Sequence, residues 1–449
     1  MVQGGAVIAS GGFGCVFVPP LKCNGQHRIP NNVSKLMNKT DALQEYREIQ
    51  VIRSKLQKIP KFSNYFMLEN VDICEIEKLS ETDLVAFDKK CKPLTKDGIN
   101  KSNINDKLNL LLSLNLPHGG LTVDSFLYKH LSHRTIETFN DGLINLLKYG
   151  ILPMNGTNTY HSDIKDSNIL IDDRNNCFRL IDWGLSVITE SNTEIPKLWK
   201  NRPFQFNVPF SNVLMSDFFI DKFDEFLHSN DCSDDISLRS FVTNFIHTWL
   251  DKRGPGHYKY INMIMYMLFR GKLDYTESET QKNQIIESEF TMRFISNYLT
   301  EILQTFSRND KTAKEIVTTY MNDVFKRNVD VWGLVISYIP ILEILFENEK
   351  SLSHKETALF AHIRNIFVNN LFLNADKPID TNKLIVQLKH INQFLHHYNG
   401  KKLKYVQNSI RLHSKRIKKT NIELKSSKRR RGVIQKTLKA INKKLLFSN

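Results

Sequence analysis

The sequence has little of what would assign a chain to a class of proteins at once. Its six cysteines include no C-x-x-C pair and no metal-site spacing, so we interpret them as reduced thiols of a cytosolic-type compartment. Residues 1–12 have no basic flank before an apolar run, which predicts no signal peptide. The longest apolar run, Val331–Phe346, is interrupted by Glu343 and predicts a buried helix rather than a transmembrane segment.

Acidic residues are nearly absent from the end of the chain, where positive charge is concentrated. The net charge is +15, and residues 401–449 contain 17 Lys and Arg against one acidic residue, Glu423, which leaves −1 for residues 1–400. This basic tail predicts binding of nucleic acid or another polyanion, or else a solvated charged terminus. Its K-S-S-K-R-R-R, at 425–431, is also typical of nuclear localisation in an otherwise cytoplasmic-type, intracellular protein.

The rest of the chain is apolar enough to fold around a large core. Its 449 residues are 41% hydrophobic and 10% aromatic, which is typical of globular domains. The length fits two or three average domains, or one large domain built of two lobes.

The most informative stretch, Tyr160–Leu185, reads Y-H-S-D-I-K-D-S-N-I-L-I-D-D-R-N-N-C-F-R-L-I-D-W-G-L. Two short apolar runs, Ile169–Ile171 and Phe178–Ile181, are split by a cluster of Asp and Asn, which predicts a β-hairpin. The hairpin would bring Asn168 at its entrance beside Asp182 at its exit. Two such hard oxygen ligands suit Mg²⁺.

This stretch resembles the catalytic loop and metal-binding D-F-G motif of eukaryotic-type protein kinases, with Ser162 in place of the usual arginine and Trp183 in place of phenylalanine. It looks most like the divergent serine/threonine kinases of large nucleocytoplasmic DNA viruses. The resemblance implies an α+β, two-lobed fold with a small β-rich lobe at 1–116 and a larger, mainly helical lobe at 117–400. The basic tail, 401–449, follows. A viral kinase would act in the host cytoplasm or the virion.

The resemblance also implies catalytic roles for residues of this stretch. Asp163 would accept the proton of an attacking hydroxyl, and Lys165 would offset charge on the transferring γ-phosphoryl group. Asn168 and Asp182 would hold Mg²⁺. Lys165 is typical of the serine/threonine branch, and Ser162 removes the arginine that reads phosphorylation, so we expect activity without a phosphorylated activation loop.

Residues 8–17, I-A-S-G-G-F-G-C-V-F, resemble the glycine-rich loop that covers the phosphates of ATP. Ala9, Gly11 and Gly14 take the three glycine positions of that loop. Val16 takes the position of the apolar residue that covers adenine.

A predicted strand and a predicted helix follow the glycine-rich stretch. V-S-K-L-M, at 33–37, predicts a strand, and Lys35 resembles the lysine that contacts the α- and β-phosphates. Asp41–Lys58 has apolar residues at helical spacing. On this helix Glu45 is expected to pair with Lys35, and Glu48 is the alternative.

Further strands are predicted at Phe66–Ile76, Leu84–Phe87 and Leu108–Leu114, interrupted by the polar loop Lys92–Asp106. Residues 115–127 resemble the hinge of the kinase family, where the backbone near Leu116 would bind adenine. Asp124 would reach the ribose or cap the next helix.

Two motifs stand out after Asp182. R-P-F-Q-F-N-V-P-F, at 202–210, resembles the end of the activation segment, which would shape the shelf for the substrate residue after the target hydroxyl. V-D-V-W-G, at 329–333, puts Asp330 where the family has a buried aspartate that holds the catalytic loop through backbone N–H groups. Between the two motifs, an insertion at about 211–320 is mostly helical in pattern. Predicted helices are Phe218–Leu227, Leu238–Leu250, Tyr258–Phe269 and Glu287–Phe306, with two or three closing helices over 355–398.

Together these features predict an ATP- and Mg²⁺-dependent kinase for Ser/Thr hydroxyls of protein substrates, and they indicate no oligomeric state. Three alternatives remain open: a pseudokinase that binds nucleotide and scaffolds a partner, a phosphotransferase for small molecules, and a polyanion-binding protein that acts through its tail. The intact Asp163, Asn168 and Asp182 argue against the first, and Lys165 argues against the second.

Overall fold

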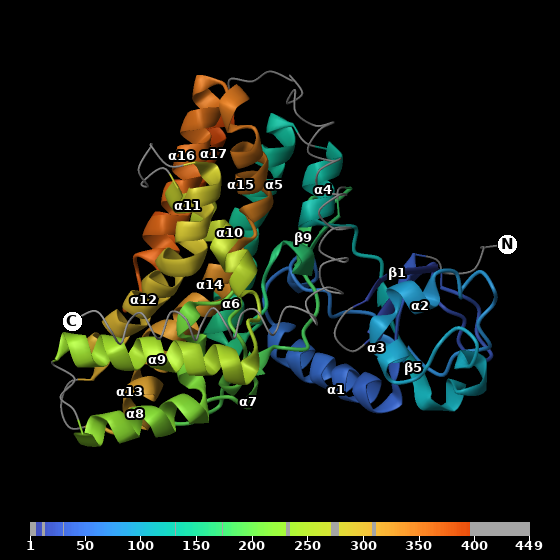
Figure 1. Cartoon of the computed structure of the whole chain (residues 1–449). Helices are drawn as coiled ribbons and strands as arrows, with labels where there is room; N and C mark the ends of the chain where they lie inside the picture. Colours follow the sequence, from blue (N-terminus) through green and yellow to red (C-terminus); the bar gives the residue numbers. More distant parts are fainter. Residues whose placement is uncertain are drawn as a thin grey trace.

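The computed structural model describes residues 6–10, 14–29, 31–130, 132–172, 174–229, 234–270, 278–307 and 311–395. Within them the chain has a mixed α+β structure, in agreement with the α+β part of the expected fold. An antiparallel sheet with short covering helices lies on one side of the molecule, and a larger, mainly helical part lies on the other (Figure 1). Gly11 and the basic tail lie outside the described residues.

Five strands form the N-terminal sheet, and each pairs antiparallel with its neighbour. In spatial order they are β1 (Ala6–Ser10), β2 (Gly14–Val18), β3 (Asn32–Asn38), β5 (Leu111–Pro117) and β4 (Asp72–Cys74). In β3, Ser34 and Leu36 are buried whereas Lys35 between them is half-buried, because successive side chains of a strand face opposite sides of the sheet. Leu36 packs in an apolar cluster with Phe87 and Leu94, and Lys35 faces away from that cluster.

Helix α1 (Lys39–Leu56) directly follows β3, close to the predicted Asp41–Lys58. Its Ile49, Ile52 and Leu56 are buried in the same apolar cluster as the helical part of the molecule. The helix therefore connects the sheet to the rest of the protein.

The prediction of strands between residues 65 and 116 is wrong in part. Only Asp72–Cys74 of Phe66–Ile76 is a strand, and Leu84–Phe87 is a turn that leads into α2 (Phe87–Lys90). The polar Lys92–Asp106 contains α3 (Lys92–Lys96). Short apolar runs do not distinguish a strand from a buried helical segment, and here Leu84, Phe87 and Leu94 cover one side of the sheet.

The interpretation of the cysteines as reduced thiols is wrong for four of them. Cys15 in β2 forms a disulfide with Cys91 between α2 and α3, and Cys23 forms one with Cys74 in β4. The partners lie 76 and 51 residues apart in the chain, so no short spacing in the sequence marked them. Both bonds tie the sheet to the segment between α1 and β5.

The apolar run at 331–346 is buried, as predicted, but it forms two helices. Helix α14 (Lys326–Ile336) ends just before Tyr338, and α15 (Ile339–Glu347) begins again with Pro340 in its first turn. A proline is tolerated there because the first N–H groups of a helix have no intrahelical partner.

The predicted helices of the insertion are present as α8 (Asp217–Ser229), α9 (Asp235–Arg253), α10 (Tyr258–Phe269) and α12 (Thr291–Phe306). They pack in the same apolar cluster as the other helices of this part. Tyr298 of α12, for example, lies 5.6 Å from Phe210 between ring centroids, and 6.2 Å from Trp332 of α14. The insertion is therefore part of the helical core.

The remaining helices of this part are α4 (Val123–His130), α5 (His133–Leu146), α6 (Leu152–Gly156), α7 (Lys197–Lys200), α11 (Glu279–Ile285), α13 (Ala313–Tyr320), α16 (His354–Phe367) and α17 (Thr381–Leu395). Helix α5 is amphipathic, with one buried face. Helices α16 and α17 are the expected closing helices. Helices α5 and α17 lie side by side, since Asn140 donates to Leu388 O at 2.8 Å.

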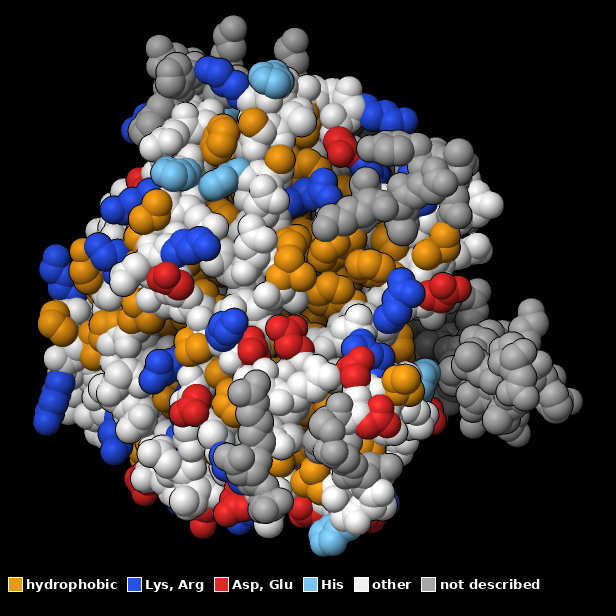
Figure 2. All heavy atoms as spheres, turned by 90° about the vertical axis from the view of Figure 1, so that its left-hand side faces the viewer, with side chains coloured by type: hydrophobic (Ala, Val, Ile, Leu, Met, Phe, Trp, Pro, Cys, Tyr) orange, Lys and Arg blue, Asp and Glu red, His pale blue; other side chains and the backbone are white. Residues whose placement is uncertain are grey.

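One helical stretch, Ala313–Glu347, is long and apolar enough to cross a membrane, but 89% of its most apolar window is buried inside the protein. That burial is typical of a core helix. On the face seen in Figure 2, hydrophobic side chains gather near the centre, and Lys and Arg are interspersed with Asp and Glu around them. This mixture agrees with the near-neutral charge of residues 1–400.

We expect the disulfides to stabilise the sheet against unfolding. Cys91→Ala should lower the free energy of unfolding by about 2–4 kcal/mol, because the Cys15–Cys91 bond closes a long loop in the unfolded chain. Urea denaturation of the oxidised protein measures this loss, and Cys177→Ala, at the unpaired Cys177, is the matched control. A thiol titration that finds six free thiols in the unreduced, denatured protein would contradict both disulfides.

Candidate active site

The predicted hairpin is present and brings Asn168 close to Asp182. Strands β8 (Ile169–Asp172) and β9 (Cys177–Leu180) are antiparallel, and β6 (Leu121–Thr122) adds a third strand beside β8. At the open end of the hairpin the N–H of Ile181 donates to the carbonyl of Asn168 at 3.0 Å. The loop His161–Asn168, which contains Asp163 and Lys165, enters the hairpin at this end.

Asp163 is the centre of the hydrogen bonds within this loop. Its Oδ2 accepts from Lys165 Nζ at 2.7 Å and from Asn168 Nδ2 at 2.9 Å. The same Nδ2 donates to the backbone carbonyl of Asp163 at 2.8 Å. The loop therefore holds three of the predicted catalytic side chains in one cluster.

Lys35 connects this cluster to the sheet and to α1. Its Nζ lies 2.6 Å from Glu45 Oε1 and 4.0 Å from Asp182 Oδ1. The pairing with Glu45 confirms the first choice of partner, since Glu48 instead accepts from Gln44 at 2.9 Å. Burial raises the pKa of Glu45, and the charge of Lys35 opposes that rise. Residues from β3, α1 and the end of the hairpin thus meet at Lys35.

Asp330 supports the loop from below, as the sequence predicted. Its fully buried carboxylate accepts from the N–H of His161 at 3.0 Å, from the N–H of Ser162 at 2.8 Å and from Asn155 Nδ2 at 2.7 Å. Helix α14 carries Asp330 and approaches the loop closely, because a Cβ at Gly333 would lie only 2.5 Å from the carbonyl oxygen of Ile164. Glycine is therefore required at that contact.

Three further polar side chains reach the loop, and sequence reasoning assigned a role to none of them. Asn207 Nδ2 donates to Asp163 Oδ1 at 2.8 Å. Arg202 Nη1 donates to the carbonyl of Ser162 at 2.7 Å, and Trp199 Nε1 donates to Ser162 Oγ at 2.9 Å. The signal that could have found Arg202 and Asn207 is the presence of polar residues within an otherwise apolar run at 202–210.

Asp163 is held as a carboxylate at neutral pH. Burial, the largest influence, raises its pKa, but Lys165, the hydrogen bond from Asn207 and the charge of Arg202 together lower the pKa below its usual value. A buried anion with this many donors is fixed in place and can accept a hydrogen bond from a reacting group.

Behind the loop, His161 and Trp183 fill the apolar interior. The ring of His161 is fully buried, lies 4.7 Å from that of Trp183, and its Nε2 is 2.9 Å from the carbonyl of Ile181. Burial lowers the pKa of His161, which makes the ring neutral. Trp183 packs edge-on against Phe66 at 5.8 Å, so it fills an apolar position immediately after Asp182.

The predicted nucleotide-contacting residues of the sheet lie on one of its sides. Val16 is opposite Lys35 across β2 and β3, and Leu116 is opposite Val33 across β3 and β5. All four side chains are half-buried, and residues two apart in a strand face the same side. They form a partly apolar strip that ends at Lys35.

The structure shows how the backbone at Gly14 packs and where Asp124 lies. A Cβ at Gly14 would lie 2.5 Å from Met37 Cγ and 2.7 Å from Leu36 O, so this glycine is required by the packing of β2 on β3. Asp124 lies inside the first turn of α4 and does not cap that helix. The backbone of Ala9 pairs with Val16.

Asn168 and Asp182 are suited to hold a magnesium ion. Asp163 occupies the amide nitrogen of Asn168, which leaves its oxygen for a cation, and the side chain of Asp182 is 47% exposed. Among the described residues no cluster of three or more His, Cys, Asp or Glu side chains could hold a metal. Mg²⁺ does not need one, since it commonly takes one or two protein oxygens and completes its coordination with phosphates and water.

Comparisons with known proteins add no relative. Neither the known protein-family models nor the curated proteins include a match to this chain.

Asp166, within the loop His161–Asn168, should make stability depend on pH. Burial, reinforced by the charge of Asp124, raises its pKa to about 6, so its ionisation opposes folding fully above that pH. The penalty falls as the pH drops through 6 and is gone below about 4, the unfolded value. Asp166→Asn should therefore stabilise the protein by on the order of 2 kcal/mol at pH 8 and by nothing at pH 4.

Urea denaturation at the two pH values measures this difference. Asp221→Asn, an exposed aspartate on α8, is the matched control and should change stability at neither pH. An Asp166→Asn variant that is equally stable to the wild type at pH 8 would contradict the prediction.

Proposed function

We propose that this protein is an ATP-dependent protein kinase that transfers the γ-phosphate to Ser or Thr hydroxyls of protein substrates. The sheet-containing part, 1–116, would be the small lobe of a two-lobed kinase-like fold, and 117–400 the large lobe. We also propose kinship with the divergent kinases of large nucleocytoplasmic DNA viruses, which rests on the sequence motifs alone.

One observation carries the proposal: Lys35, paired with Glu45 at 2.6 Å, lies 4.0 Å from Asp182. Asp182 is far from Lys35 and Glu45 in the sequence, and the three residues come from a hairpin end, a strand and a helix. Since Asn168 lies at the same hairpin end and contacts Asp163, five side chains of the sequence motifs occupy one site. Such a meeting of a cation, paired carboxylates and an amide suits phosphoryl transfer, in which positioning and electrostatic stabilisation supply most of the rate.

In this proposal Asp163 would receive the acceptor hydroxyl. Its Oδ1 accepts from Asn207 and its Oδ2 from Lys165 and Asn168, so the carboxylate cannot rotate freely. The acceptor hydroxyl would donate to the remaining lone pair of Oδ1 and lose its proton to this carboxylate as its oxygen attacks the γ-phosphorus. The bond from the γ-phosphorus to the oxygen that bridges it to the β-phosphate would break, and ADP would leave with that oxygen. Lys165, 2.7 Å from Asp163, would offset charge on the transferred group.

Lys35 would bind the α- and β-phosphates of ATP, and the strip formed by Val16, Val33 and Leu116 would cover the adenine. Glu45 keeps the Lys35 ammonium group in place through both of its carboxylate oxygens, at 2.6 and 2.8 Å. A magnesium ion held by Asn168 and Asp182 would neutralise charge on the phosphates.

The acceptor side favours a protein substrate. Segment 202–210 lies beside Asp163 through Asn207, which also donates to the carbonyl of Ile164 at 3.2 Å. This segment of irregular backbone next to the carboxylate could serve as a shelf for a substrate chain.

Asp163→Asn should abolish the chemical step while ATP still binds. We expect kcat to fall by about 10³-fold, because the amide neither takes the proton nor retains the charge, whereas Kd for ATP should change by less than about 3-fold. Transfer of γ-labelled phosphate to generic basic proteins measures kcat, and calorimetry measures Kd. Asp221→Asn, on exposed α8, should match the wild type in both.

Two outcomes would contradict the proposal. If the wild type binds ATP but labels no protein acceptor, the chain would be a nucleotide-binding scaffold. If it labels hydroxyl-bearing metabolites and no protein, it would be a small-molecule phosphotransferase.

A further inference from the structure

Two segments that are distant from Ser162 in the sequence bind its N–H, its carbonyl and its hydroxyl oxygen. Its N–H donates to Asp330 Oδ1 at 2.8 Å, its carbonyl accepts from Arg202 at 2.7 Å, and its hydroxyl oxygen accepts from Trp199 at 2.9 Å. Ser162 has φ of 60°, a left-handed conformation that an L residue adopts at some cost. The surrounding contacts therefore determine the conformation of the residue just before Asp163.

Arg202 is an unusual group to bury at this place. It is 6% exposed, its Nη2 lies 3.8 Å from Asp163 Oδ1, and its Nε and Nη2 have no hydrogen-bond partner among the described residues. Burying a cation is costly unless anions compensate it. Asp163 and Asp330 are the two carboxylates whose charges act on Arg202. The guanidinium therefore links the reacting carboxylate to the one that supports the loop.

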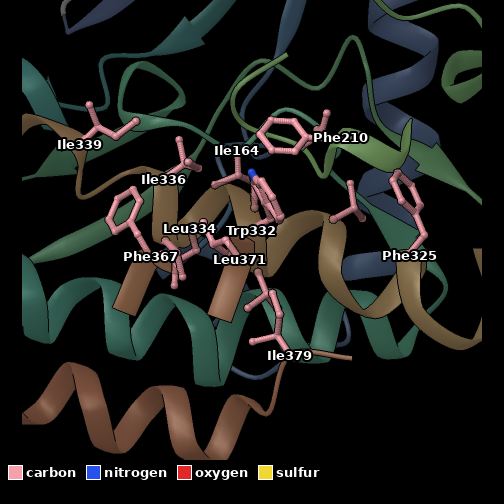
Figure 3. Close-up of a cluster of buried hydrophobic side chains, with 14 of the residues drawn as sticks. Ile164, Phe210, Phe325, Trp332, Leu334, Ile336, Ile339, Phe367, Leu371 and Ile379 are labelled. Atoms are coloured by element: carbon pink, nitrogen blue, oxygen red, sulfur yellow. The ribbon is translucent and has the colours of Figure 1, made fainter. Parts of the chain in front are cut away.

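The segment that carries Trp199 and Arg202 is itself held by the helical part. The N–H of His257 donates to the carbonyl of Phe204 at 2.8 Å, and Trp332 Nε1 donates to that of Phe206 at 3.0 Å. At the end of the segment, Phe210 packs edge-on against Trp332 at 5.5 Å. Figure 3 shows Phe210, Trp332 and Ile164 gathered in one part of the core.

The exposed hydroxyl groups of the preceding segment take no part in these contacts. Ser191 and Thr193 bond to each other at 2.9 Å. The bonds that fix Ser162 come instead from three buried groups of the chain itself: the Asp330 carboxylate, the Arg202 guanidinium and the Trp199 indole.

We propose that Arg202 and Trp199 are positioning residues that hold the loop 161–168 in its transfer-competent conformation, so that catalysis needs no phosphorylated residue in 182–202. The inference rests on the proposed function and deepens it, because it states how the same site is regulated. The buried contacts replace the charge pair that a phosphate would otherwise supply.

Removing the guanidinium should lower kcat without weakening nucleotide binding. Arg202→Met should reduce kcat by on the order of 10- to 100-fold and leave KM for ATP within about 2-fold, because Arg202 contacts the loop and no residue of the sheet. Arg202→Lys retains the charge and one donor, so it should recover part of the loss. Arg134→Met, at an exposed arginine of α5, is the matched control.

A second variant removes only the indole donor. Trp199→Phe keeps a ring against Tyr160 and Phe325, which lie 5.7 and 5.1 Å from Trp199, and should lower kcat by about 3- to 10-fold. If Arg202→Met and Trp199→Phe both keep the wild-type kcat, the proposal is overturned.

Phosphorylation is tested directly on the same protein. Phosphatase-treated protein, with no phosphate in 182–202 by peptide mass, should keep wild-type kcat, and so should the double variant Ser191→Ala/Thr193→Ala. Loss of activity on treatment, together with a phosphate mapped to this segment in the untreated protein, would overturn the proposal.

Hydrogen exchange separates this proposal from the proposed function. The amides of 161–168 should exchange about 10-fold faster in Arg202→Met than in the wild type, while those of α9 and α12 stay unchanged. A wild type that transfers no phosphate would refute the kinase function. The exchange result would still decide whether Arg202 positions the loop 161–168. Equal exchange of these amides in the wild type and in Arg202→Met would refute the positioning role of Arg202, even if the protein is an active kinase.

Discussion

The rest of the structure depends on one buried anion, the carboxylate of Asp163. A charge removed from water is tolerated only where donors and opposite charges replace its hydration. Here Lys165 and Asn168 come from its own loop, and Asn207 and Arg202 come from the segment that follows the hairpin. Neither part would be stable in this position without the other. The arrangement of the loop, the hairpin and the later segment is therefore one energetic unit.

Asp330 extends the same constraint into the core. It is fully buried, burial raises its pKa, and the hydrogen bonds it accepts from His161 and Ser162 oppose that rise. Arg202 contributes a positive charge that acts on both Asp163 and Asp330. The close approach of α14 at Gly333 then fixes the distance between the supporting helix and the loop. Packing and electrostatics thus set the same geometry.

The sequence predicted those parts of the site that depend on local patterns. The hairpin followed from two apolar runs around turn residues, and Glu45 followed from its place on an amphipathic helix. The resemblance also predicted the contact of Asp330 with the loop, but other pairings between distant residues were missed. Cys15 and Cys91 meet because the chain folds back over the sheet, and Trp199 meets Ser162 through a path that no spacing encodes. The prediction of a strand at Leu84–Phe87 was wrong for a different reason. A run of four apolar residues fits a strand and a buried helical turn equally.

The helical insertion acquires a physical role from these contacts. Gly256, with φ of +51°, brings the chain so close to segment 199–210 that a Cβ there would lie 2.3 Å from the carbonyl oxygen of Phe204. His257 then donates to that same carbonyl, just before α10 begins. Because this segment carries both Arg202 and Asn207, helices far from Asp163 in the sequence support the position of its donors. The helices of residues 211–320 therefore stabilise segment 199–210 beside Asp163 by buried packing.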